Sequence, residues 1–114
     1  MAPIEIAATA VRRLRGICGM PEGSMVMLVP CRDVHTIGLV RPIDVAFVDG
    51  DGVVLSSYRR VGPRRRLRHA RAAAVVERWS KDGEAWFSQG DRLEMTARSA
   101  CGAEAKERKA RSRL

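Results

Sequence analysis

The sequence predicts a small, mostly β domain, an antiparallel β-sandwich or distorted barrel with one or two short helices. Residues 25–29 form an unbroken apolar run of strand length, which is typical of a strand covered on both faces. Residues 43–48 carry apolar side chains at both parities of an extended chain, so both faces of this strand should also be covered. Residues 49–52, Asp-Gly-Asp-Gly, can adopt the positive φ angles of a tight turn, and residues 53–55 are expected to return as the hairpin partner.

The other elements of the first two thirds are predicted by weaker local patterns. Residues 4–6 alternate apolar and charged side chains, which predicts a short opening strand, and residues 9–16 predict a helical turn that ends at a glycine. Residues 34–40 are rich in β-forming side chains and predict a strand before the proline at position 42. Residues 56–71 are polar and contain a Gly-Pro pair, so we expect a strand end that becomes an exposed loop.

In the last third of the sequence, the pattern of one segment fits either a helix or a strand. The alanines of residues 72–79 favour a helix, whereas their valines and Trp79 favour a strand. Residues 84–89 predict one helical turn, and residues 92–95 alternate charged and apolar side chains as a last strand would. Apolar periodicity ends beyond Thr96. We therefore expect residues 1–97 to form a single β domain and residues 98–114 a basic, flexible tail that is either disordered or a frayed helix.

The charge and the cysteine content indicate which partners and which cellular environment to expect. Twenty-one Lys and Arg face thirteen Asp and Glu, and the net charge of +8 should attract polyanions or acidic membrane surfaces. The three cysteines are odd in number and have no C-x-x-C spacing, which indicates neither a disulfide scaffold nor a zinc site. The chain has no signal-like start and no apolar run near the ~20 residues of a membrane span. We expect a reduced, cytoplasmic protein without a membrane span.

Four segments of the chain resemble a known bacterial and archaeal family. They are VRRLRGICGM, MVMLVPCRDVHTIGLVRPIDVAFVDGDGVVL, AAAVVERW and QGDRLEM. Together they are similar to the family called domain of unknown function 192 over about residues 4–96, and HTIGLVRPIDVAFVDGDG is the most specific block. The resemblance implies a mostly antiparallel β domain with a small helix after the first strand, a strand at residues 72–79, and no established activity.

The chain departs from the common family pattern at the positions where a pocket would be inferred. Residues 34–36 are Val-His-Thr where many members have Phe-Trp-Met, and Cys18 and Met20 replace Met and Arg after Arg15-Gly16. Any site known from other members is therefore not carried over to this chain.

Two side chains are candidates for acid-base chemistry. His35 shares strand parity with Ile37 and Leu39, so its imidazole is expected to point toward an apolar face, and we favour a core histidine over a general base or ligand. Asp44 lies after Pro42 at a strand start, where a carboxylate commonly accepts backbone N–H groups. A sharper hypothesis pairs His35 with Asp44, because a carboxylate can fix the tautomer of an imidazole.

Other possible sites are incomplete in the sequence. Cys31 lies about 13 Å from His35 if the chain between them is extended, which disfavours a thiolate-imidazole dyad and favours a buried structural thiol. Asp49 and Asp51 lack the further ligands of a calcium loop, so we interpret them as turn residues. The sequence predicts no metal site and no cofactor.

The densest block of positive charge lies between residues 59 and 71. It consists of Arg59, Arg60, Arg64, Arg65, Arg66, Arg68 and Arg71. Such a block could bind an anion or neutralise several phosphates, although a solvated loop is the simpler interpretation because only Tyr58 lies nearby as an aromatic platform.

These observations leave three functional hypotheses. The first is a non-catalytic binding or accessory module that presents residues 35–42 and the arginines to a protein partner or polyanion. The second is a small hydrolase-like enzyme that uses His35 and Asp44. The third is low-specificity binding of nucleic acid or another polyanion through the block from Arg59 to Arg71. We lean against an enzyme, because no set of nucleophile, base and orienting group is legible.

Overall fold

The computed structural model describes residues 4–9, 15–93 and 110–111, and nearly all regular structure in this part of the chain is β. The largest sheet has five strands in the order β1-β2-β7-β4-β5. Its strands are β1 (Ile4–Ala7), β2 (Met25–Leu28), β7 (Ala74–Trp79), β4 (Ile43–Val48) and β5 (Val54–Val61). β1 runs parallel to β2, and the other neighbours are antiparallel. The predicted fold class is confirmed, and residues 74–79 form the strand that the alanines left in doubt.

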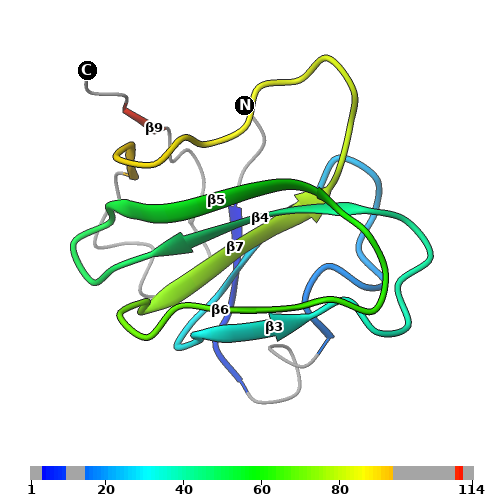
Figure 1. The fold of residues 1–114 in the computed structure, drawn as a ribbon, viewed down its shortest axis with the longest axis horizontal. Coiled ribbons are helices and arrows are strands. Elements are labelled where there is room, and N and C mark those ends of the chain that lie inside the picture. Colours follow the sequence, from blue (N-terminus) through cyan, green and yellow to red (C-terminus); the bar gives the residue numbers. More distant parts are fainter. Residues whose placement is uncertain (1–3, 10–14, 94–109, 112–114) are drawn as a thin grey trace.

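Two further pairs of strands accompany the large sheet. β3 (Asp33–His35) pairs with β6 (Arg66–Arg68), and in Figure 1 these two strands lie side by side next to β7. β8 (Arg92–Leu93) pairs with β9 (Ala110–Arg111). The remaining residues of the predicted flexible tail lie outside the described part of the chain.

The large sheet is covered on both faces because its central strands are apolar at both parities. Every residue of β2 and β4 is buried. Side chains that alternate along a strand point to opposite faces, so the sheet supplies two separate cores. One core contains Val26, Leu28, Val45, Phe47 and Val75 together with Val34 from β3. The other contains Met27, Ala46, Val48 and Val76 together with Phe87 and Leu93 from the C-terminal segment.

The β4–β5 hairpin has the turn that the sequence predicts. The Asp49 carboxylate accepts hydrogen bonds from the Asp51 and Val53 N–H groups at 2.8 and 3.0 Å, and Gly52 has φ of +87°. β5 is longer than expected, since it continues to Val61. Residues 56–71 are therefore not a strand end leading into a loop: they contain most of β5 and all of β6.

Two other local predictions differ from the structure, and a third cannot be compared with it. Residues 84–89 contain no helical turn. The strand expected at residues 34–40 is only β3, because the chain turns after His35 and Gly38 has φ of +90°. Most of the helical turn predicted at residues 9–16 lies outside the described residues; Arg15 is helical, and turns follow it from Gly16 to Gly19.

Candidate functional site

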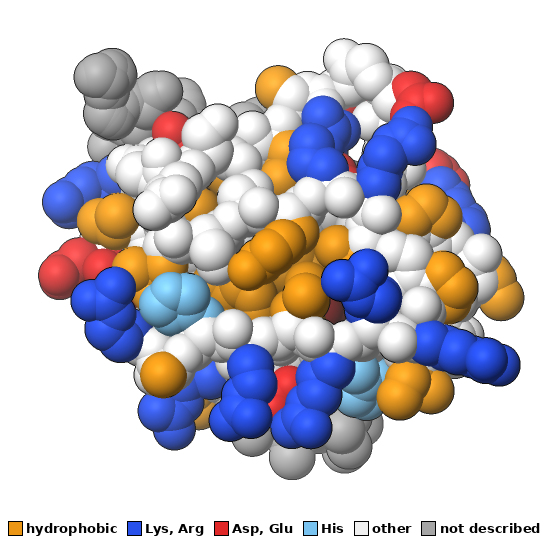
Figure 2. Space-filling model, viewed as in Figure 1, with side chains coloured by type: hydrophobic (Ala, Val, Ile, Leu, Met, Phe, Trp, Pro, Cys, Tyr) orange, Lys and Arg blue, Asp and Glu red, His pale blue; other side chains and the backbone are white. Residues whose placement is uncertain are grey.

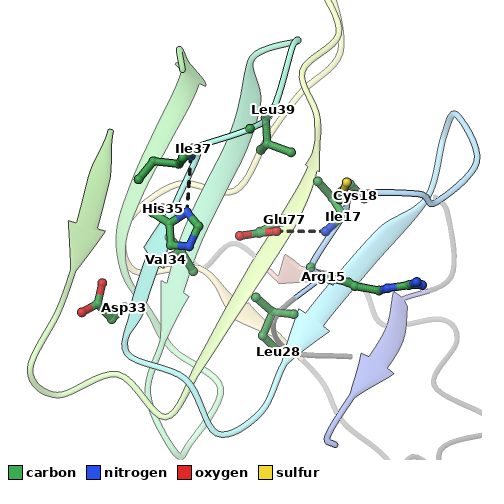
Figure 3. Close-up of a pocket in the computed structure, with 12 residues that line it drawn as sticks. Arg15, Ile17, Cys18, Leu28, Asp33, Val34, His35, Ile37, Leu39 and Glu77 are labelled. Carbon is green, nitrogen blue, oxygen red and sulfur yellow. Dashed lines mark hydrogen bonds between the residues drawn. The ribbon is translucent and has the colours of Figure 1, made fainter. Parts of the chain in front are cut away.

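A pocket of about 350 Å³ lies on the face of the large sheet that carries the first core. Its walls come from β2, β7, β3, the turn after residue 15 and the turn after β3. Apolar side chains make up much of the lining, namely those of Ile17, Leu28, Val34, Ile37 and Leu39. The polar side chains of the lining are those of Arg15, Cys18, Asp33, His35 and Glu77. Figure 3 shows Glu77 between His35 on one side and Ile17 on the other.

Glu77 is the buried ionisable group of this pocket. It lies on β7 opposite Val26 of β2 and Val45 of β4, and only 4% of its surface is exposed. Burial disfavours the charged form of a carboxyl group and raises the pKa of Glu77 to about 7. The Ile17 N–H donates to Glu77 Oε1 at 3.2 Å, which lowers this pKa by a smaller amount. Near neutral pH this side chain therefore exists in both protonation states.

The turn after Arg15 is shaped to fit the Glu77 carboxyl. Gly16 has φ of +53°, and a Cβ at this position would lie 2.6 Å from Glu77 Oε1. Glycine allows the backbone to approach the carboxyl closely, and the next residue can then donate its N–H to Oε1. A backbone amide 60 positions away in the sequence thus holds one oxygen of Glu77 in place.

His35 lies at the rim of the pocket and not in the core. Its side chain is exposed, whereas its neighbours Val34 and Thr36 are buried, so the prediction that His35 points toward the core is wrong. His35 and Ile37 do share one face, but it is the exposed one: Ile37 is 66% exposed, and Val34 is the residue of β3 that packs into the first core. His35 Nδ1 accepts a hydrogen bond from the Ile37 N–H at 3.3 Å.

Thr36 anchors this rim to the β5–β6 connection. Its hydroxyl donates to the Gly62 carbonyl at 2.7 Å and accepts from the Arg65 N–H at 2.9 Å. The side chain is 1% exposed. The segment after β3 is therefore attached to a second loop, which fixes the edge of the pocket.

Asp44 lies on the opposite face of the sheet from this pocket. It is opposite Arg78 in the pairing of β4 with β7, whereas Glu77 is opposite Val45, and successive residues of a strand point to opposite faces. Asp44 is fully buried, and its Oδ2 accepts from Arg78 Nε at 2.9 Å. The structure therefore does not bring His35 and Asp44 together.

The carboxylate oxygens of Asp44 contact donor groups at an irregularity of β5. One residue of β4 faces two residues of β5 here, Arg59 and Arg60, and Arg60 has φ of +54°. Asp44 Oδ1 accepts from the Arg60 N–H at 3.0 Å, and the Arg59 guanidinium lies 3.7 Å from Oδ2. The carboxylate does accept a backbone N–H, but across the sheet and not in the local turn that the sequence suggested.

The arginine block is divided between paired and unpaired side chains. Arg59 contacts Asp44, Arg60 pairs with Asp82 and Arg66 pairs with Asp33, whose pKa is lowered by the hydrogen bonds from Arg66. Within the described part of the chain, the remaining four exposed arginines have no carboxylate partner: Arg64, Arg65, Arg68 and Arg71. Figure 2 shows basic side chains along the edge of the molecule near β3 and β6, around a more apolar centre.

Cys31 and a possible metal site are the remaining candidates from the sequence. Cys31 is half-buried, packs against the first core, and its Sγ donates to the Asp33 carbonyl at 3.4 Å. Among residues 4–9, 15–93 and 110–111, no three His, Cys, Asp or Glu side chains are close enough to hold a metal ion. The same residues include no helix long and apolar enough to cross a membrane.

Sequence reasoning missed Glu77 and Gly16, which define the pocket. The carboxylate within the apolar run AAAVVERW is a signal of a buried polar site, because glutamate is rarely fully buried unless it has a partner. The face to which Glu77 points could not be read from the sequence, since it depends on the pairing of β7 with β2 and β4.

Comparisons with known proteins place the fold among solved structures. The chain is similar to a protein of unknown function from Novosphingobium aromaticivorans, with a TM-score of 0.58 and 17% identity over 96% of this chain and 74% of that one. It is also similar to a "putative transcription regulator" from Sinorhizobium meliloti, with a TM-score of 0.57 and 14% identity over 94% of this chain and 80% of that one. No protein-family model and no curated protein matches the sequence. At these identities the likeness defines a shared β-rich fold and nothing further.

Proposed function

We propose that this chain is a non-catalytic binding module that holds an apolar part of its ligand or partner in the pocket over Glu77. The observation that carries the proposal is the pocket itself. Its volume of about 350 Å³ lies in the range of small-ligand sites, and its lining combines apolar walls with a few polar groups.

The rim of the pocket continues these apolar walls onto the surface. Ile37 is 66% exposed and lies at the rim, and Val40, three residues further along the same segment, is 89% exposed. Exposed apolar side chains beside a cavity are a common feature of interaction sites. Because Thr36 ties this segment to the β5–β6 loop, the rim is preorganised, which reduces the entropic cost of binding.

The hydrolase alternative has no support from the positions of its two residues. Asp44 is buried against Arg78, Arg59 and the Arg60 N–H, on the face of the sheet opposite the pocket that His35 borders. An imidazole and a carboxylate must lie within hydrogen-bond reach to act as a pair.

Polyanion binding is a second candidate, and the four arginines without a carboxylate partner favour it. Their charges are available to phosphate groups, whereas those of Arg60 and Arg66 are partly neutralised by Asp82 and Asp33. The likeness to the Sinorhizobium protein adds only a shared fold to this candidate. Membership of the family called domain of unknown function 192 likewise stays a proposal, supported by the β-rich fold that the resemblance implies.

The pocket can be tested with the thiol of Cys18, which is exposed and lies in its lining. In a Cys31→Ser, Cys101→Ser variant, Cys18 is equilibrated with disulfides that carry butyl or phenyl groups, in the presence of 2-mercaptoethanol. Mass spectrometry measures the bound fraction. If the pocket accepts these groups, they should be retained roughly tenfold more than a hydroxyethyl group, as burial of about two methylenes would give.

The matched control moves the thiol to the exposed β4–β5 turn. A Cys18→Ser, Asp51→Cys variant in the same background places it away from the pocket. Retention should there be independent of the attached group. Equal retention at Cys18 and at position 51 would contradict the proposed function.

A further inference from the structure

Glu77 has unused hydrogen-bonding capacity inside the pocket. An ionised carboxylate offers two oxygens and about four acceptor positions. Among the described residues, the Ile17 N–H is the hydrogen-bond donor to this group, and it contacts Oε1 alone. Buried polar groups are nearly always hydrogen-bonded, and buried charges nearly always have a partner. The pocket that Glu77 lines is where a ligand could supply the missing donor.

Within residues 4–9, 15–93 and 110–111, no side chain provides a cation to this carboxyl. In the described part of the chain, the influences on its pKa are burial and the Ile17 N–H, and no charged side chain contributes. Arg15 lines the pocket, but its side chain extends away from Glu77 in Figure 3. The other polar side chains of the lining are Cys18, His35 and Asp33, and Asp33 is already paired with Arg66.

The remaining walls favour an aliphatic stem. Ile17, Leu28 and Leu39 contribute apolar surface around the carboxyl. A ligand with methylene groups would bury them against these side chains, and each buried group would tighten binding roughly fourfold. A donor at its end would meet Glu77 in surroundings of low dielectric, where the attraction between opposite charges is much stronger than in water.

We propose that the group that enters this pocket is a protonated amine on an apolar stem, with its ammonium at Glu77 and its methylenes against Ile17, Leu28 and Leu39. This inference rests on the proposed function, because it names the ligand of the same pocket. The amine could belong to a free alkylamine or to the lysine side chain of a partner protein, and the two share one recognition chemistry.

The test again uses disulfide exchange at Cys18. The attached groups are now three of equal length that end in ammonium, methyl or carboxylate. In the Cys31→Ser, Cys101→Ser variant at pH 8, the ammonium group should be retained about tenfold more than the methyl group, as one well-formed charged hydrogen bond gives. In the added variant Glu77→Gln this preference should disappear while the methyl group is still retained. Glu22→Gln removes an exposed carboxylate outside the pocket and should leave the preference unchanged.

The outcomes separate the two proposals. Equal retention of ammonium and methyl groups, both above the position 51 control, would overturn the amine and leave the binding pocket. Retention of none of the groups above that control would overturn the pocket as well. A preference for ammonium that persists in Glu77→Gln would also overturn the inference, because groups other than the Glu77 carboxyl would then cause it.

A second measurement distinguishes the sources of the amine and needs no tether. The titration of the Glu77 carboxyl is monitored by carbon-13 NMR with butylammonium or with Nα-acetyl-lysine methylamide added. A bound cation favours the ionised form, so a saturating amine that binds tenfold more tightly to the ionised state lowers this pKa by about one unit. A shift with the lysine derivative alone assigns the site to a protein side chain, and a shift with both assigns it to amines in general. No shift with either would overturn the inference.

Discussion

At the scale of single residues, Glu77 is the group whose chemistry depends most on the fold. A carboxyl group at the surface ionises near its usual pKa of 4.5, whereas burial raises the pKa of Glu77 to about 7. The folded protein therefore binds a proton more tightly than the unfolded chain between these two values. Stability that comes from this group is present below pH 4.5 and is lost as the pH rises through about 7.

We expect Glu77→Gln to remove this pH dependence, because glutamine keeps an oxygen for the Ile17 N–H and carries no charge. Relative to the variant, the wild-type protein should lose about 2–3 kcal/mol of unfolding free energy between pH 5 and pH 8. Urea denaturation of both proteins at the two pH values measures the difference. A constant difference between the proteins would show that Glu77 titrates normally.

Gly16 allows a second prediction at the residue scale. Alanine at this position must adopt a positive φ and also brings its Cβ to 2.6 Å from Glu77 Oε1, whereas Gly19 has φ of +85° and nothing within 4 Å of an added Cβ. The backbone cost is about 1 kcal/mol or more at either site. We expect Gly16→Ala to destabilise the protein clearly more than Gly19→Ala does, as thermal or urea unfolding would show. Similar losses would mean that the carboxyl moves aside freely.

At the scale of elements, the irregularity of β5 depends on a buried carboxylate. The extra residue of β5 leaves the Arg60 N–H without a partner in the sheet, and Asp44 accepts it. The same carboxylate accepts from Arg78, whose guanidinium also lies 4.7 Å from the centre of the Trp86 ring. β4, β5, β7 and the segment that contains Trp86 are thus connected through one side chain.

Asp44→Ala should therefore destabilise the fold strongly. The substitution leaves Arg78 Nε and the Arg60 N–H without an acceptor, while Arg78 keeps its contacts with Glu84. Removal of one partner of a buried ion pair costs about 3–5 kcal/mol. Asp82 pairs with Arg60 at the surface and has an 81% exposed side chain, so Asp82→Ala should have a much smaller effect. Urea denaturation of the two variants tests this contrast, and equal losses would contradict the role of Asp44.

At the scale of the whole molecule, the net charge of +8 comes from arginines that differ in their surroundings, because some have a carboxylate partner and others do not. Some arginines face carboxylates, as Arg41 does with Glu22, Arg60 with Asp82 and Arg66 with Asp33. The exposed arginines of the β5–β6 connection and β6 without such partners should account for most binding of polyanions.

Replacement of Arg64, Arg65 and Arg68 by serine tests this. The slope of the logarithm of DNA affinity against the logarithm of salt concentration should fall by about 2–3, because each lost phosphate contact reduces it by roughly 0.7–0.9. The control replaces Arg41, Arg60 and Arg66 by serine, which gives the same net charge and should change the slope less. Equal slopes for the two triple variants would show that net charge alone decides affinity.

The elements with strong local patterns could be predicted, and the candidate site largely could not. β2, β4 and the Asp49–Gly52 turn are encoded by runs of apolar residues and by glycine beside aspartate, which are properties of neighbouring positions. The sequence predicts the wrong face for His35, because Val34 and not His35 is the β3 residue that packs into the first core, and the packing of β3 on the large sheet decides which parity is buried. Of the residues that line the pocket, the sequence indicates a possible role for His35 but none for Glu77 or Gly16.

The amino-acid sequence is enough to specify a β domain, because strands covered on both faces need the apolar residues at both parities that positions 25–28 and 43–48 provide. Which ionisable groups share a site is settled by the folded arrangement alone. Glu77 and Ile17 are 60 positions apart, and Asp44 and Arg78 are 34 apart. The pKa of a buried group depends on such long-range neighbours and on the exclusion of water, neither of which is encoded in a local pattern.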